Sequence, residues 1–224
     1  GPVSLNRLLD RFSGDPIAVL DAGKNDLLGI AGVRSPAVNS LLRWRSLFDL
    51  DREKEMVIGQ GARFVDREDA RYPELLKEIH DPPIGLYVLG DYDFRLPSVA
   101  IVGSRRTTLY GQGVAREMAR ELAHRGICVT SGMARGIDTF AHRGALDSER
   151  GKTVAVMGCG LDIVYPPENI DLHREIGKRG AVVSEFPFRR RADKQTFPMR
   201  NRLVSGMSQA VVVVESDQSG GSLI

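Results

Sequence analysis

The sequence predicts an α/β protein in which a small all-helical domain, residues 3–58, precedes an open, Rossmann-like parallel sheet, residues 59–224. Three observations predict this class. Apolar runs such as 98–103 show no polar alternation, which is typical of strands buried on both faces. Helical stretches separate these runs at intervals of about 25 to 30 residues, as the crossovers of a parallel sheet require. Leucines at helical spacing near the start predict the helical domain.

The helical domain is predicted to begin with two short helices. The first carries apolar residues at helical spacing from Leu5 to Phe12, and Ser13-Gly14 ends it. Asp15-Pro16 then offers an N-cap followed by proline at the first helical position. A glycine-rich turn, 29–33, leads to a helix that starts at Ser35-Pro36 and carries apolar side chains as far as Phe48. The charged patch 51–55 is predicted to be the end of this helix or a short linker.

The order helix, Gly-x-Gly turn, helix resembles a helix-hairpin-helix unit, whose turn amides can face a DNA phosphate. Small helical units of this kind also serve as packing modules. Residues 1–90 carry 12 Lys/Arg against 14 Asp/Glu, which favours packing. Both interpretations stay open at this point.

In the second part of the chain, apolar runs alternate with helical segments. The two earliest runs are interpreted as a lobe added to the sheet. The predicted strands are 62–65, 85–90, 98–103, 127–130, 153–157, 181–184 and 210–214. The predicted helices are 72–79, 111–124, 137–146, 166–176 and one that begins at Pro198.

Composition excludes several classes of protein. A 42% hydrophobic share with 27% charged residues is typical of a soluble globular chain. The longest apolar run, 210–214, is far too short to span a membrane, so we expect a cytoplasmic protein. Cys128 and Cys159 are too far apart for a zinc site or a disulfide framework, and the four histidines form no metal-ligand pair. We therefore predict no metal and no cofactor.

Positive charge is concentrated between residues 189 and 202. This stretch contains Lys194, Arg200, Arg202 and the triple arginine 189–191, six cations against Asp193 alone, in a chain whose net charge is +2. A local basic strip of this kind indicates an anionic partner. The triple arginine is read either as a solvated turn or as a direct DNA contact.

The loops that follow the predicted strands should converge, because ligands of open parallel sheets bind at the carboxyl ends of the strands. The loop Gly103-Ser104-Arg105 combines a flexible residue, a hydroxyl and a guanidinium beside a helix N-terminus, which favours anion binding. It lacks the Gly-x-Gly-x-x-Gly pattern of dinucleotide sites. The loop 131–138 repeats the combination with Ser131, Gly132, Arg135 and Gly136.

Phe197 stands between Lys194 and Arg200 in the basic strip. A groove for single-stranded nucleic acid needs aromatic platforms among its cations, because unpaired bases expose their faces. The alternative for Phe197-Pro198 is a hydrophobic plug before a helix. Asp138, Glu185 and Glu215 lie at strand ends, but no catalytic triad, metal cluster or Walker loop accompanies them. We therefore expect these carboxylates to pair with arginines, and we predict no catalytic residue.

Five ordered motifs resemble the bacterial DNA-processing protein A (DprA/Smf) family, and the resemblance covers nearly the whole chain. It implies a sterile-alpha-motif-like helical domain and an extended Rossmann fold that binds single-stranded DNA without sequence preference. It also implies a recombination mediator, not an enzyme, that protects incoming DNA during natural transformation and helps to load RecA. The motifs are 102–105, 131–138 with Ala141-His142, 158–162 with Tyr165-Pro166, 184–187, and 197–202.

The resemblance assigns DNA contact first to Arg105, Lys194 and Phe197. Further residues are expected to form the walls and floor of the same pocket: Gly103, Ser104, Ser131, Gly132, Arg135, Gly136, Arg200, Asn201 and Arg202. The chain ends at 219–224, where a further helix is expected to start, so the Rossmann domain looks truncated. The homodimer interface and RecA contacts expected of the full-length family member would lie in or after that region.

The alternative class is an enzyme. A nucleotide or nucleoside-monophosphate hydrolase of the lysine-decarboxylase-like Rossmann group would place a carboxylate such as Glu215 at the sheet edge. That group resembles Pro-Gly-Gly-x-Gly-Thr after the fifth strand of the parallel sheet. Here the turn 216–221 reads Ser-Asp-Gln-Ser-Gly-Gly, which is a poor match.

Overall fold

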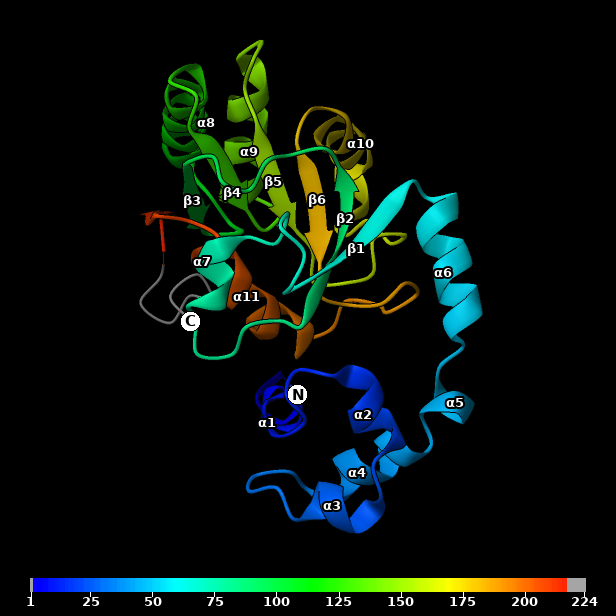
Figure 1. Cartoon of the computed structure of the whole chain (residues 1–224). Coiled ribbons are helices and arrows are strands. Elements are labelled where there is room, and N and C mark those ends of the chain that lie inside the picture. The colour runs from blue at the N-terminus through cyan, green and yellow to red at the C-terminus, as the bar shows by residue number, and fades with distance from the viewer. Residues whose placement is uncertain (1, 217–224) are drawn as a thin grey trace.

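A computed structural model describes residues 2–216 and contains a mixed seven-stranded sheet with the strand order β1-β2-β6-β5-β4-β3-β7 (Figure 1). The five strands from β6 to β7 are parallel. At the other edge β2 is antiparallel to both β6 and β1. The strands are β1 (Ala62–Asp66), β2 (Gly85–Gly90), β3 (Ser98–Gly103), β4 (Cys128–Ser131), β5 (Thr153–Val156), β6 (Ala181–Ser184) and β7 (Ala210–Val214). The predicted fold class is confirmed, but β1 and β2, expected as an added lobe, form an antiparallel edge of the same sheet.

Helices cover both faces of this sheet. One face packs on α7 (Glu74–Lys77) and α11 (Thr196–Gly206), with Leu76 and Leu203 fully buried between helices and sheet. The other face packs on α8 (Leu109–His124), α9 (Ile137–Asp147) and α10 (Ile170–Arg179), which follows the 3₁₀ turn η1 (Pro167–Asn169). Burial on both faces explains why strands such as β6, with all four residues buried, carry no polar alternation.

The first part of the chain forms a separate helical core below the sheet in Figure 1. The helices of this core are α1 (Pro2–Arg11), α2 (Pro16–Asp21), α3 (Lys24–Leu28) and α4 (Ser35–Leu42). Two helices follow, α5 (Trp44–Leu47) and α6 (Leu50–Gly59), and α6 runs beside the sheet (Figure 1). The predicted N-cap is confirmed, since the Asp15 carboxylate accepts hydrogen bonds from the amides of Ile17 (2.8 Å) and Ala18 (3.2 Å). The domain boundary at 58/59 stays a prediction, and Met56 and Val57 pack against the core of the sheet.

Several predicted boundaries were wrong for local reasons. The single helix expected over 35–48 is two helices, because Arg43 leaves the helical region with φ −108° and ψ 12°. The charged patch 51–55 lies inside α6, which Asp49 caps by accepting from the Arg52 amide at 3.1 Å. The helix expected from Pro198 starts two residues earlier. The segment 217–224, where a further helix was expected, lies outside the described residues.

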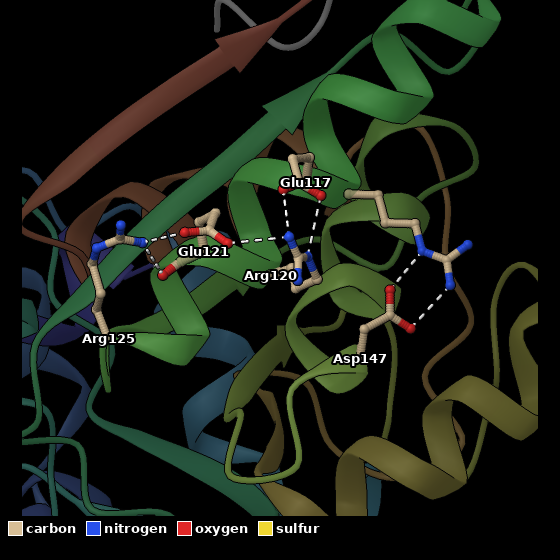
Figure 2. A network of polar contacts seen from close by, with 6 residues as sticks. Glu117, Arg120, Glu121, Arg125 and Asp147 are labelled. Carbon is tan, nitrogen blue, oxygen red and sulfur yellow. Dashed lines mark hydrogen bonds and ion pairs between the residues drawn. The ribbon is translucent and has the colours of Figure 1, made fainter.

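Ion pairs neutralise most of the charge on the outer face of α8 (Figure 2). Arg116 joins α8 to α9 through two hydrogen bonds to Asp147, at 2.6 and 2.9 Å. Arg120 and Arg125 pair with carboxylates of their own helix, Glu117 and Glu121. Exposed pairs of this kind add little stability, about 0–1 kcal/mol each. Their consequence is that these arginines do not present free positive charge.

None of the helices within residues 2–216 combines the length and the apolar character that a membrane span requires.

Candidate nucleic-acid interface

The parallel strands bring two of the predicted contact residues together. Arg105 follows β3 and Phe197 lies in the first turn of α11, and the Arg105 Cζ atom lies 5.0 Å from the centroid of the Phe197 ring. A guanidinium at this distance over an aromatic face is a cation–π contact. Arg105 is exposed and Phe197 is half-buried. The predicted convergence of these two loops is therefore seen directly.

Lys194 lies in a tight turn just before α11. The Asp193 carboxylate organises this turn by accepting hydrogen bonds from the amides of Gln195 (2.8 Å) and Thr196 (2.9 Å). This cap explains why α11 begins before Pro198. Lys194 is exposed, and neither Lys194 nor Arg105 forms an ion pair with any side chain of residues 2–216. Among the described residues, no carboxylate competes with an anion for either cation.

Neighbouring segments hold the backbone of the Arg105 loop on two sides. The Ser104 amide donates to the Glu215 carbonyl at 2.6 Å, and the Ser104 carbonyl accepts from the Ile137 amide at 3.2 Å. Gly136, with φ 77°, lets the two loops approach closely, since a Cβ atom there would lie 2.2 Å from the Ser104 oxygen. Gly103 has the same role, because its Cβ would lie 1.8 Å from the Val214 oxygen. Because neither position has room for a Cβ atom, the two glycines let these segments pack closely and so position Arg105.

The N-terminus of α8 is occupied by a carboxylate of the chain itself. Glu215 accepts hydrogen bonds from the Thr108 amide (2.9 Å), from the Thr107 hydroxyl (2.7 Å) and from the Thr108 hydroxyl. These bonds, led by the one from the Thr108 hydroxyl, lower the pKa of Glu215. A carboxylate of the chain thus lies where the sequence suggested that this helix attracts a phosphate, and anion binding at this loop stays a prediction.

In the loop after β4, a carboxylate of the chain itself also accepts hydrogen bonds from the loop amides. The buried Asp138 carboxylate accepts from the amides of Gly132 (3.1 Å) and Ala134 (3.2 Å). Burial raises the pKa of Asp138, and the nearby Arg200 guanidinium acts in the opposite direction. Ser131 is fully buried and its hydroxyl donates to the Ile101 carbonyl at 2.6 Å.

Arg200 is a buried residue of α11. It is 3% exposed, and its Nη1 atom donates to the Val156 carbonyl at 3.1 Å. Burial lowers its pKa, while the charge of Asp138 acts against that shift. A Cβ atom on Gly132 would lie 1.5 Å from Nη1, so only glycine leaves room for this guanidinium. Ser131, Gly132 and Arg200 thus pack together in the interior, and their part in a binding site stays a prediction.

Two predicted arginines are bound to carboxylates. Arg135 pairs with Glu168, with 3.1 Å between Nη2 and Oε2, and this pairing raises the pKa of Arg135. Arg202 bridges Asp81 (2.8 Å) and Glu185 (2.6 Å) with its side chain only 16% exposed. The prediction that Glu185 pairs with an arginine is confirmed. Asn201 is half-buried on the same helix, between Arg200 and Arg202. Arg202 connects α11 to the rest of the fold rather than facing solvent.

The sequence reasoning did not single out Tyr165 as a site residue. Its ring centroid lies 5.6 Å from that of Phe197, with the planes at 47°. Gly158, at the end of β5, lies under Phe197, since a Cβ there would be 3.2 Å from the ring atom Cδ1. The sequence feature that could have identified Tyr165 is its position after the glycine-rich end of a strand, at the sheet edge where the other candidate residues lie.

The described residues 2–216 contain no group of three or more His, Cys, Asp or Glu side chains that could hold a metal ion. Both cysteines are buried, and burial raises the pKa of Cys128 to about 12 and that of Cys159 to about 11. Thiols with such pKa values are poor nucleophiles at neutral pH.

Comparisons with known proteins point to one family. A family model described as DNA recombination-mediator protein A matches residues 63–224. Protein Smf of Synechocystis sp. is 34% identical over 236 residues, which cover all of this chain and 57% of that protein. DNA processing protein DprA of Bacillus subtilis is 36% identical over 167 residues, which cover 74% of this chain and 56% of that protein. The chain thus spans little more than half the length of these relatives.

Two solved structures are similar over most of the chain. DNA processing protein A from Streptococcus pneumoniae aligns with a TM-score of 0.84 at 32% identity, covering 100% of this chain and 76% of that one. DNA processing protein A from Helicobacter pylori, described for its single-stranded DNA binding mode, aligns with a TM-score of 0.66 at 34% identity, covering 72% and 73%. The match to the family model and the similarity to these relatives show that the chain belongs to the DNA recombination-mediator protein A family.

Proposed function

We propose that this chain binds single-stranded DNA without sequence preference, as the DNA-binding part of a recombination mediator. The observation that carries the proposal is the Arg105 guanidinium over the Phe197 ring, at the strand edge where Arg105 and Lys194 are exposed and without ion pairs among residues 2–216. Cations contact phosphates and an aromatic ring stacks with a base, the combination that single-strand sites use. The single-stranded DNA binding mode described for the Helicobacter pylori relative supports this proposal.

Each part of the site has a separate role in this proposal. Arg105 and Lys194 contact phosphates, and Phe197 stacks with a base. Gly103, Ser104 and Gly136 position the Arg105 loop, and the buried Ser131, Gly132 and Arg200 support it. Arg135 and Asn201 complete the walls, while Arg202 holds α11 in place through Asp81 and Glu185. Duplex DNA hides its base faces, so a ring can contribute to binding only when the strand is single.

The wider role is a proposal based on membership of the family. We propose that the full-length protein acts in the cytoplasm during natural transformation, as a homodimer that protects incoming single strands and delivers them to the RecA recombinase. We propose no catalytic step. Glu215, the carboxylate that a hydrolase would use, accepts three hydrogen bonds at the start of α8, and its lowered pKa makes it a poor general acid at neutral pH.

The test is a salt titration of binding to a fluorescent oligothymidylate, followed by anisotropy. We expect Arg105→Ala and Lys194→Ala each to weaken binding and to reduce the slope of log K against log salt by about 0.7. We expect Phe197→Ala to cost about 1–3 kcal/mol with the slope unchanged, since it removes stacking and not charge.

The matched control is Arg125→Ala, which removes an exposed arginine that is already paired with Glu121 on α8. It should change neither the affinity nor the slope. Duplex DNA of the same sequence should compete poorly. Equal affinity for single strands and duplex, or binding without salt dependence, would contradict the proposal.

A further inference from the structure

Four side chains from four separate segments form a continuous row along the strand edge, with a cation at each end and two rings between them. Arg105 lies over Phe197 at 5.0 Å, and Phe197 is 5.6 Å from Tyr165. At the other end, Glu168 has the largest effect in raising the pKa of Arg135, and the nearby Tyr165 side chain raises it further. The row therefore extends well beyond the contact between Arg105 and Phe197.

The two rings differ in how much of their surface is free. Phe197 is half-buried, with the Arg105 guanidinium over the ring and the Gly158 backbone close to its Cδ1 edge. Tyr165 is 40% exposed. Of the two residues, Tyr165 is thus the more exposed.

The backbone after Tyr165 is held in place by buried contacts. Pro166 is buried, and the Asn169 side chain donates to the Met133 carbonyl (3.1 Å) and to the Thr139 hydroxyl (2.9 Å). These bonds attach the segment to the loop that carries Arg135. A ring on an anchored segment loses little conformational entropy when a base stacks on it.

We propose that Tyr165 is a second base platform, so that the site takes two consecutive nucleotides of a single strand, one base at Phe197 and Arg105 and the next at Tyr165. This inference rests on the proposed function. The 5.6 Å between the ring centroids exceeds the 3.4 Å rise per nucleotide of B-form DNA. A single strand can stretch to this spacing because no partner strand holds its bases in place. The two platforms would therefore also disfavour duplex.

The competing explanation is that Tyr165 only supports the Phe197 ring. A double-mutant cycle separates the two roles. If Tyr165 is a platform, Tyr165→Ala weakens binding to oligothymidylate roughly 5- to 150-fold at constant salt slope. The double variant Tyr165→Ala/Phe197→Ala then binds clearly more weakly than either single variant. A double variant no weaker than Phe197→Ala would overturn the proposal.

Two controls isolate stacking from other effects. Tyr165→Phe keeps the ring and should bind within about threefold of the wild type, because stacking needs no hydroxyl. Tyr110→Ala removes a tyrosine that is 80% exposed in the first turn of α8 and makes no ring contact with Phe197. It should leave affinity unchanged. A loss for Tyr110→Ala equal to that for Tyr165→Ala would overturn the assignment.

A direct readout is ultraviolet cross-linking of an oligonucleotide that carries 5-iododeoxyuridine, with the attachment site mapped by mass spectrometry. We expect adducts at Tyr165 as well as Phe197. Adducts at Phe197 alone, with wild-type affinity for Tyr165→Ala, would refute the second platform and leave the proposed function intact. Absence of single-strand binding by the wild-type chain would instead refute the proposed function itself.

Discussion

Gly136 offers a sharp test of how the Arg105 loop is positioned. A Cβ atom at this residue would lie 2.2 Å from the Ser104 carbonyl oxygen and 2.9 Å from the Arg105 Cα atom. These are backbone atoms, so no side-chain rotation relieves the overlap. The φ of 77° adds a cost of about 1–2 kcal/mol for any residue with a Cβ. Gly136→Ala therefore has to move the loop that carries Arg105.

We expect Gly136→Ala to lower the free energy of unfolding by about 2–4 kcal/mol. Displacing packed backbone costs about 1–3 kcal/mol in addition to the φ penalty, and reduced freedom of the unfolded chain returns about 0.4–1 kcal/mol. The measurement is urea unfolding followed by circular dichroism. Under conditions where the variant stays folded, its affinity for single-stranded DNA should fall as far as that of Arg105→Ala.

The matched control is Gly113→Ala in the middle of α8, where a Cβ atom would meet nothing within 4 Å. This substitution should raise stability by up to about 1 kcal/mol, because alanine favours the helix interior over glycine. A Gly136→Ala variant within about 0.5 kcal/mol of the wild type, or with wild-type affinity, would refute the close approach of the two loops.

Two further predictions concern buried groups. Burial lowers the pKa of His142 from 6.5 to about 3, so the unfolded chain takes up a proton that the native ring does not, and stability falls as the pH drops below 6.5. When the pH falls from 7.5 to 5, the free energy of unfolding of His142→Gln should decrease by about 2 kcal/mol less than that of the wild type. Urea unfolding at the two pH values measures this, and an equal decrease for both proteins would contradict the burial effect. Arg202→Ala should cost about 1–3 kcal/mol of stability, because it leaves two carboxylates unpaired. Its folded form should bind DNA within about twofold of the wild type, and a much weaker Arg202→Ala would mean that this arginine contacts DNA directly.

The parallel sheet could be predicted because its signal is local. Runs such as Ala181–Ser184 are apolar at every position, and only burial on both faces of a sheet explains that pattern. Parallel topology then places the carboxyl ends of the five parallel strands at one edge, which predicts that Arg105 and Phe197 approach each other. Helix ends were less predictable, because a short cap such as Asp193 before α11 or a break at Arg43 depends on backbone angles.

The sequence identified the candidate residues of the site, but it did not show which of their side chains are exposed to a ligand and which are bound to other side chains. Arg105 and Arg202 are alike in sequence terms, since each follows a small or polar residue in a basic, strand-end segment. The structure leaves Arg105 exposed over Phe197 and holds Arg202 between Asp81 and Glu185. The partner Asp81 is remote in sequence, and spacing along the chain does not encode such a contact.

The sequence by itself therefore determined the parallel strands and the edge of the sheet where the glycine- and arginine-rich loops lie, because burial and charge are properties of single segments. Only the tertiary structure decided which groups remain available to a ligand. Glu215 fills the helix terminus that seemed suited to a phosphate, Asp138 fills the loop after β4, and Tyr165 lies beside Phe197. Each of these outcomes depends on contacts between segments that only the folded chain brings together.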